Sequence, residues 1–220
     1  MDLLALRLTL QLACCTTTVL LVLGLPLAHW LARSRRPWKW MVEAVVALPL
    51  VLPPTVLGFY LLWATSPSSW FGRAYEAGTG HMLPFTFVGV LVASVIYNLP
   101  FAVRPFVAAF STVDRRLLEA AWCLGSSPWR TFWRVTLPLA KPGILSGLVL
   151  TFAHSVGEFG VVLMVGGNIP GVTRTLSIAI YDDVQALDYA TAGRTSLVLL
   201  IFAFLMLAVV HGLQKRLPHL

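Results

Sequence analysis

The sequence predicts an all-α integral membrane protein, built as a helical bundle of about five transmembrane helices in a single domain over residues 1–220. Composition is the first observation: 58% of the residues are hydrophobic and 11% are charged, with a mean hydropathy of +0.81, outside the range of soluble domains. The second is that the apolar residues gather in runs of roughly 20 or more, enough for a helix to cross about 30 Å of hydrocarbon.

Five apolar runs are predicted to cross the membrane, at residues 8–32, 41–65, 84–109, 143–165 and 196–213. The first is too long for the apolar part of a signal peptide and lacks a small-residue cleavage site, so we expect it to remain in the protein. The second contains Pro49, Pro53 and Pro54. Because proline removes a helical hydrogen bond, we expect this span to be kinked or interrupted.

Basic residues cluster in the loops on one side of the membrane, as cytoplasmic loops do. They follow the first run, occupy the loop between the third and fourth runs, and end the chain, where Lys215 and Arg216 lie. We therefore expect a multi-pass protein of a bacterial or archaeal cytoplasmic membrane, with the N-terminus outside and the C-terminus inside. This clustering explains the formal charge of +7 without nucleic-acid binding.

The loop at residues 110–142 is too polar to insert, yet it is patterned as two short helices. Thr112 or Asp114 can cap the first helix, and Gly125 can end it. Ser127 and Pro128 can begin the second helix. The predicted arrangement is a helix, a tight turn and another helix.

The second helix of this loop is predicted to end at Leu137-Pro138 and to carry an apolar face of Trp129, Phe132 and Trp133. An interfacial helix lying on anionic headgroups is the alternative interpretation of that face.

The spacing of residues in this loop resembles the EAA loop of ABC-importer permeases, through Glu119-Ala120-Ala121, Gly125 and Val135-Thr136-Leu137-Pro138. The resemblance implies a loop that couples the membrane helices to a separate ATPase. We expect Glu119 to orient this loop through hydrogen bonds or an ion pair with Arg115 or Arg116. The coupling residues implied are Glu119, Ala120, Ala121, Gly125, Ser127, Pro128, Trp129 and Phe132. The chain has no phosphate-binding GxxxxGK[ST] loop, so we expect no enzyme and no cofactor here, with ATP and Mg²⁺ bound by the partner ATPase.

Three polar residues within the apolar runs are candidates for a function: His154, Glu158 and Asn98. His154 and Glu158 stand four residues apart, which would place them on one helical face. A proton relay or a metal pair is possible by residue type, but two ligands are too few for zinc, and a hydrogen-bonded pair that locks two helices is the simpler interpretation. Asn98 is expected to satisfy backbone groups freed by Pro100.

Three further motifs are similar to those of molybdate-importer permeases, at residues 48–54, 157–160 and 167–175. This resemblance implies a homodimer with a pore on its axis, two ATPase subunits, surrounding lipid and an external oxyanion-binding protein, carrying molybdate or tungstate. A sulfate or thiosulfate permease remains the alternative. The candidates for the translocation pathway or gate are Pro53, Pro54, Asn98, Glu158 and Phe159.

Two other classes of protein fit less well. A secondary transporter would normally show internal repeats with paired broken helices, and an intramembrane enzyme would need converging catalytic groups. The three cysteines have neither disulfide nor metal-ligand spacing, so no catalytic residue and no metal site is predicted.

Overall fold

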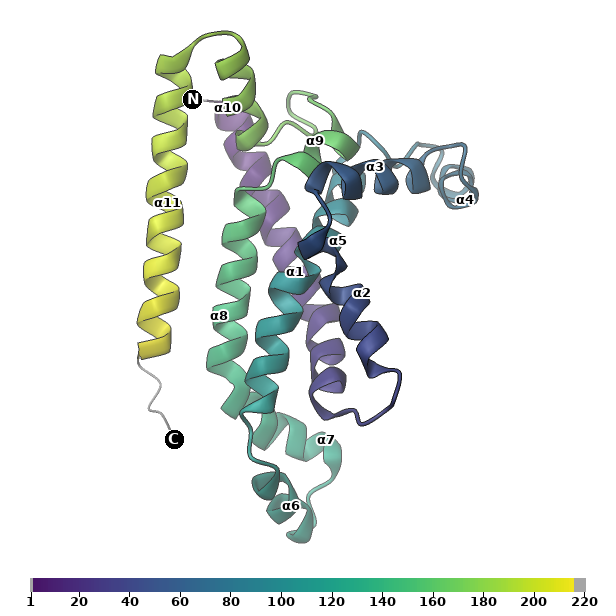
Figure 1. The fold of residues 1–220 in the computed structure, drawn as a ribbon, viewed down its shortest axis with the longest axis vertical. Coiled ribbons are helices and arrows are strands. Elements are labelled where there is room, and N and C mark those ends of the chain that lie inside the picture. Colours follow the sequence, from purple (N-terminus) through teal and green to yellow (C-terminus); the bar gives the residue numbers. More distant parts are fainter. Residues whose placement is uncertain (1, 216–220) are drawn as a thin grey trace.

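The computed structural model describes residues 2–215, and within this range every regular element is a helix. Figure 1 shows an elongated bundle whose long helices run along its long axis. Its helices are α1 (Leu3–Arg33), α2 (Lys39–Val51), α3 (Pro54–Thr65), α4 (Trp70–Thr79), α5 (Phe87–Ser111), α6 (Arg115–Cys123), α7 (Pro128–Thr131), η1 (Phe132–Thr136), α8 (Leu137–Val156), α9 (Gly160–Gly166), α10 (Leu176–Gln185) and α11 (Tyr189–Lys215). The predicted tail residue Arg216 lies outside the described residues.

Four helical segments are long and apolar enough to cross a membrane, or five if the bent pair α2 and α3 counts as one span, in the part of the chain described. The predicted all-α bundle is therefore confirmed. The first, third and fifth predicted runs correspond to α1, α5 and α11.

The centre of the bundle is formed by α1, α5 and α8, which pack together (Figure 1). Phe106 and Phe110 of α5 are fully buried there. Gly143 and Gly147 of α8 face α5 so closely that an added Cβ would lie 2.6 Å from the Cβ of Ala109 and 2.9 Å from Cε1 of Phe106, respectively. Small residues spaced four apart let two membrane helices approach, so these glycines set the distance between α5 and α8.

The predicted interruption of the second span is confirmed. Helix α2 ends at Val51 and α3 begins at Pro54, with 113° between the two helices. Leu52 and Pro53 are extended, with ψ values of 135° and 137°. Each precedes a proline, which disfavours the helical conformation, so the Pro53-Pro54 pair turns α3 across the long axis (Figure 1).

The fourth predicted span, residues 143–165, was wrong at both ends, because the helix begins earlier and α8 ends at Val156. Residues Pro128–Val156 form one continuous helical stretch of 29 residues, so the second helix of the loop does not end at Leu137-Pro138. A proline clashes with the carbonyl four residues earlier in a regular α-helix, but η1 is a wider π-helical turn in which the Leu137 N–H bonds to the Phe132 oxygen. The helix therefore accommodates Pro138 and continues into α8.

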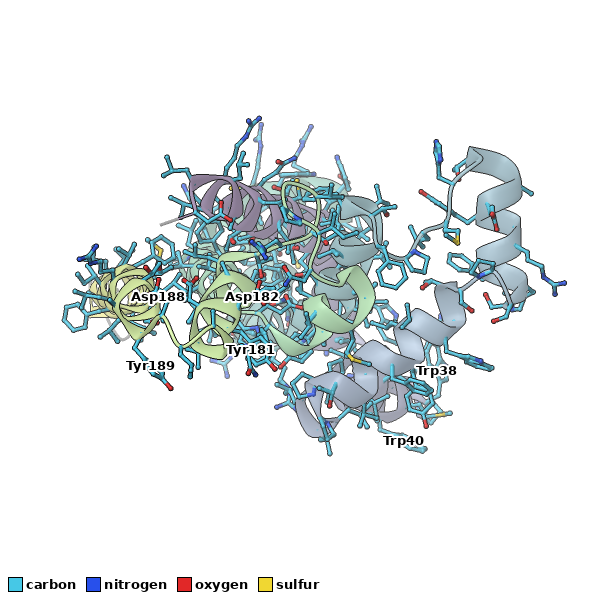
Figure 2. All side chains as sticks on the ribbon, turned by 90° about the horizontal axis from the view of Figure 1, so that it is seen from above. Trp38, Trp40, Tyr181, Asp182, Asp188 and Tyr189 are labelled. Carbon is cyan, nitrogen blue, oxygen red and sulfur yellow. The ribbon has the colours of Figure 1, made fainter. Side chains whose placement is uncertain are left out.

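The polar stretch between the second and third spans contains a short amphipathic helix, α4, which begins at a Ser69 cap and ends at Gly80 with φ +74°. Figure 2 shows α4 and α11 at opposite edges of the molecule. Trp38 and Trp40 also lie at the periphery (Figure 2), 44% and 65% exposed. Exposed aromatic residues of this kind suit the boundary between lipid and water.

Candidate functional site

Two helix breaks face each other inside the bundle. Helix α8 ends at Val156, and α9 begins at Gly160 after the three-residue break Gly157-Glu158-Phe159. An added Cβ on Gly160 would lie 2.9 Å from the Cβ of Pro54, the first residue of α3. The interruption of the second span therefore packs directly against the interruption of the fourth.

The side chain of Glu158 enters a buried polar cluster rather than lipid, and Glu158 is only 4% exposed. Its Oε2 atom accepts hydrogen bonds from Ser94 Oγ at 2.6 Å and from Asn98 Nδ2 at 2.9 Å. Because the Asn98 amide nitrogen donates to the carboxylate, the Asn98 Oδ1 atom is left to accept, and it lies 2.8 Å from His154 Nδ1. This arrangement requires a proton on His154 Nδ1. We call Ser94, Asn98, His154 and Glu158 the polar cluster.

Two expectations about these residues were wrong. His154 and Glu158 do not share a helical face, because α8 ends between them, and Asn98 of α5 bridges the two side chains. Asn98 also donates to the Ser94 carbonyl at 2.8 Å, whereas the carbonyl freed by Pro100 is that of Ile96. Ser94 was not predicted, although its position four residues before Asn98 puts both on one face of α5.

An open cavity of about 580 Å³ lies beside the polar cluster. His154 and Glu158 line it, together with Pro54, Tyr97, Phe159 and Gly160. The His154 ring stacks on Phe101 with 3.7 Å between the ring centroids. Of the five candidates for the translocation pathway, Pro54, Glu158 and Phe159 line the cavity, Asn98 is fully buried behind it, and Pro53 lies in the adjacent break.

The loop that follows the C-terminal end of α5 has the predicted form of two helices and a tight turn. The Asp114 carboxylate accepts from the Arg116 N–H and caps α6. Gly125 follows with φ +80°, and the Gly125 and Ser126 N–H groups bond back to the Trp122 and Ala121 carbonyls. Glycine adopts this left-handed conformation without steric cost, so the predicted role of Gly125 in ending the helix is confirmed.

The turn leads into α7, which Ser127 caps through its hydroxyl and Pro128 begins. Glu119 pairs with Arg115 at 2.8 Å rather than with Arg116, and both side chains are more than half exposed. The tip of the loop exposes apolar and small residues to its surroundings: Leu117, Ala120, Trp122, Leu124, Gly125, Pro128 and Trp129.

The three aromatic residues of the second loop helix do not form one exposed face. Trp129 and Trp133 are 71% and 50% exposed. Phe132 instead points into the bundle, with its ring centroid 4.9 Å from His29 and 6.2 Å from Phe110. Trp129 is therefore available to a partner, while Phe132 attaches the loop to the membrane helices.

The motif at residues 167–175 forms a closed loop at the end of the molecule opposite α6 and α7. Arg174 donates to Asn168 Oδ1 and to Asp182 Oδ2, both at 2.7 Å, and Asn168 also donates to Asp182 at 2.7 Å. Asp182 belongs to α10, near the centre of the view in Figure 2. These contacts fix the loop against α10.

Comparison with known proteins places the chain in a family. Residues 21–218 match the description "Binding-protein-dependent transport system inner membrane component". The molybdenum transport system permease protein ModB of Azotobacter vinelandii is 52% identical over 215 residues, covering 97% of this chain and 95% of the relative. The probable sulfate transport system permease protein cysT of Chlorokybus atmophyticus is 35% identical, covering 94% of this chain and 72% of the relative.

Solved structures share the fold. A bacterial alginate ABC transporter in complex with an alginate pentasaccharide-bound periplasmic protein has a TM-score of 0.77 at 18% identity, covering 97% of this chain and 78% of that one. The MetNI methionine ABC transporter in an inward-facing conformation has a TM-score of 0.69 at 20% identity, covering 95% and 94%. Because the family model matches residues 21–218, the chain belongs to the family of binding-protein-dependent transport system inner membrane components.

Proposed function

We propose that this chain is the permease subunit of an ATP-driven importer that carries molybdate or tungstate across the cytoplasmic membrane. The observation that carries the proposal is the 52% identity to a molybdenum transport permease over 97% of the chain. The loop at residues 110–142 supports the same function, because its exposed apolar tip suits docking to a soluble partner.

The working assembly we propose is a homodimer with two ATPase subunits and an external oxyanion-binding protein, surrounded by lipid. ATP and Mg²⁺ belong to the ATPase subunits. The open cavity beside the polar cluster supports a second copy of the chain closing the pore, since a single chain leaves one side of the cavity open.

The N-terminus is proposed to lie outside and the C-terminus inside. The basic residues that follow α1 lie at the same end of the molecule as α6 and α7 (Figure 1), as cytoplasmic positive charge requires. In a cysteine-free background, Ser68→Cys should react with an impermeant thiol reagent from outside and Ser127→Cys only after permeabilisation. Both positions are exposed. Labelling of position 127 in intact cells would mean that the true orientation is the opposite of the one proposed. Thr173 cannot serve as a probe because it is fully buried.

The helix from Pro128 to Val156 suggests how ATPase closure reaches the pore. Its 29 residues run without a break through α7, the π-helical turn η1 and α8. One end carries the exposed Trp129, and the other ends at the break that holds Glu158. A tilt imposed on the loop is therefore passed to the wall of the cavity along a continuous helical stretch.

The decisive experiment is uptake by proteoliposomes that contain the chain, its ATPase and the external binding protein. We expect ATP-dependent accumulation of molybdate, and loss of both ATPase association and uptake in Trp129→Ala. The matched control is Trp40→Ala, which removes an exposed tryptophan of α2. Absence of coupled uptake with the intact chain, after ATPase association has been verified, would contradict the proposal.

Sulfate or thiosulfate is the second candidate substrate, supported by the sulfate permeases among the relatives. Competition for uptake discriminates between the two candidates. Unlabelled molybdate and tungstate should displace labelled molybdate at much lower concentration than sulfate or thiosulfate does, and the opposite order would assign the chain to sulfate transport.

A further inference from the structure

A second cavity, of about 600 Å³, lies at the end of the molecule that carries α6 and α7. It is bounded by the end of α1, by α6 and by the α7–η1 turn, and we call it the basic cleft. It is separate from the cavity beside the polar cluster, with which it shares no lining residue.

Positive charge in the basic cleft is not neutralised by the residues that line it. Arg33, Arg35 and Arg115 line the cleft, and no aspartate or glutamate does. Glu119, which pairs with Arg115, lies outside the lining and is half exposed. Three guanidinium groups around one cavity repel one another unless an anion joins them.

Hydrogen-bond donors in the cleft are also incompletely used. The Nε–H group of Arg33 is buried and has no hydrogen-bond partner among the residues whose side chains the structure describes. The Nη2 atom of Arg33 reaches the Phe110 and Val113 carbonyl oxygens only at 3.4 Å. Buried donors without partners are costly, whereas arginine forks bind tetrahedral oxyanions through two parallel bonds.

We propose that the basic cleft binds a tetrahedral oxyanion group, with Arg33 and Arg35 as its principal ligands. The group is the phosphate of an anionic lipid or a free oxyanion in solution, since both present the same oxygen atoms. Basic pockets at the ends of membrane helices bind lipid phosphates in this way, and the cleft lies where α1 ends.

Occupation of the cleft adds a link between parts of the chain that, among the described residues, are otherwise joined only by the long Arg33 contacts to the Phe110 and Val113 carbonyls and by packing. Arg33 ends α1 and Arg35 follows it, Arg115 begins α6, and Thr131 ends α7. An anion held between them fixes the orientation of the loop relative to α1. Binding should therefore rigidify the loop and raise the thermal stability of the chain.

The test uses the full chain purified in neutral detergent, with phosphatidylglycerol, inorganic phosphate and sodium molybdate as separate probes. Binding is measured by calorimetry and lipid retention by native mass spectrometry. The Arg33→Gln/Arg35→Gln variant should bind at least about tenfold more weakly, because each charge-assisted contact is worth roughly that factor. The control is Arg36→Gln, whose guanidinium lies 5.7 Å from the Trp38 ring centroid and does not line the cleft. If the double variant does not fold, Arg35→Gln alone serves, because Arg35 is exposed.

Selective retention of phosphatidylglycerol identifies the lipid as the source of the group, and binding of phosphate or molybdate without lipid retention identifies a free oxyanion. The proposal is overturned if the intact chain binds none of the three probes, or if the arginine and control variants bind alike. It is also overturned if Arg35→Gln abolishes ATPase association without any added anion while leaving binding of the probes unchanged. That outcome would mean that a carboxylate of the ATPase fills the cleft.

Discussion

Replacing Asn98 by leucine should weaken the bundle measurably, because Asn98 holds two other segments of the chain. Its amide contacts Glu158 Oε2 at 2.9 Å and His154 Nδ1 at 2.8 Å, and Asn98 itself is fully buried. Hydrogen bonds between membrane helices average about 0.6 kcal/mol and reach about 1.7. Those to charged groups in proteins reach about 3 kcal/mol.

Two such bonds predict a loss of about 2–3 kcal/mol for Asn98→Leu, with the Glu158 carboxylate keeping only the Ser94 bond. For a chain of this length that corresponds to a Tm lower by roughly 4–12 °C. The assay is thermal unfolding of the purified chain in detergent, followed by intrinsic fluorescence.

The matched control is Thr151→Val. Thr151 is also fully buried, but its hydroxyl bonds only to the Gly147 carbonyl of the same helix, at 2.8 Å. We expect this control to lose less than about 1 kcal/mol. Equal Tm values for Asn98→Leu and Thr151→Val would refute the argument that the polar cluster holds α5 to the break after α8.

Three further substitutions follow from the same structure. Glu158→Gln should fold but lose about 1 kcal/mol of stability, because the new amide nitrogen would occupy the position of Oε1, which is buried and has no hydrogen-bond partner among the described residues. Uptake by this variant should fall only partly, and complete loss of uptake in an assembled complex would indicate that the charge of Glu158 is essential. Gly125→Val should impair ATPase association, whereas Gly125→Asn should retain it, because asparagine tolerates the left-handed conformation. A Cβ at this position meets nothing within 4 Å, so equal association of the two variants would exclude the left-handed backbone of Gly125 as the reason for its role. Gly147→Val should lower the free energy of unfolding by about 1–3 kcal/mol, because the added side chain overpacks Phe106. The control in thermal unfolding is Gly193→Val, where a Cβ has open space, and a similar Tm for both variants would count against close packing of α5 on α8.

The sequence alone determined the class of the protein and much of its local structure. Long apolar runs must be helices, because only a helix satisfies the backbone groups of a single segment in hydrocarbon. The Pro53-Pro54 pair, the Gly125 turn and the Ser127 cap were predictable because each acts within a few residues of itself.

Tertiary structure decided which distant residues meet. Whether Pro138 ended the loop helix depended on a π-helical turn that preserves the path into α8, which the general clash of proline with a preceding carbonyl does not predict. His154 and Glu158 have helical spacing, but the break at Gly157 placed them on either side of Asn98. Phe132 has the same residue type as an exposed anchor, yet it turned inward because His29 and Phe110 lie beneath it. Asn98 is far in the sequence from His154 and Glu158, and His29 and Phe110 are far from Phe132, so local periodicity carries no information about these contacts.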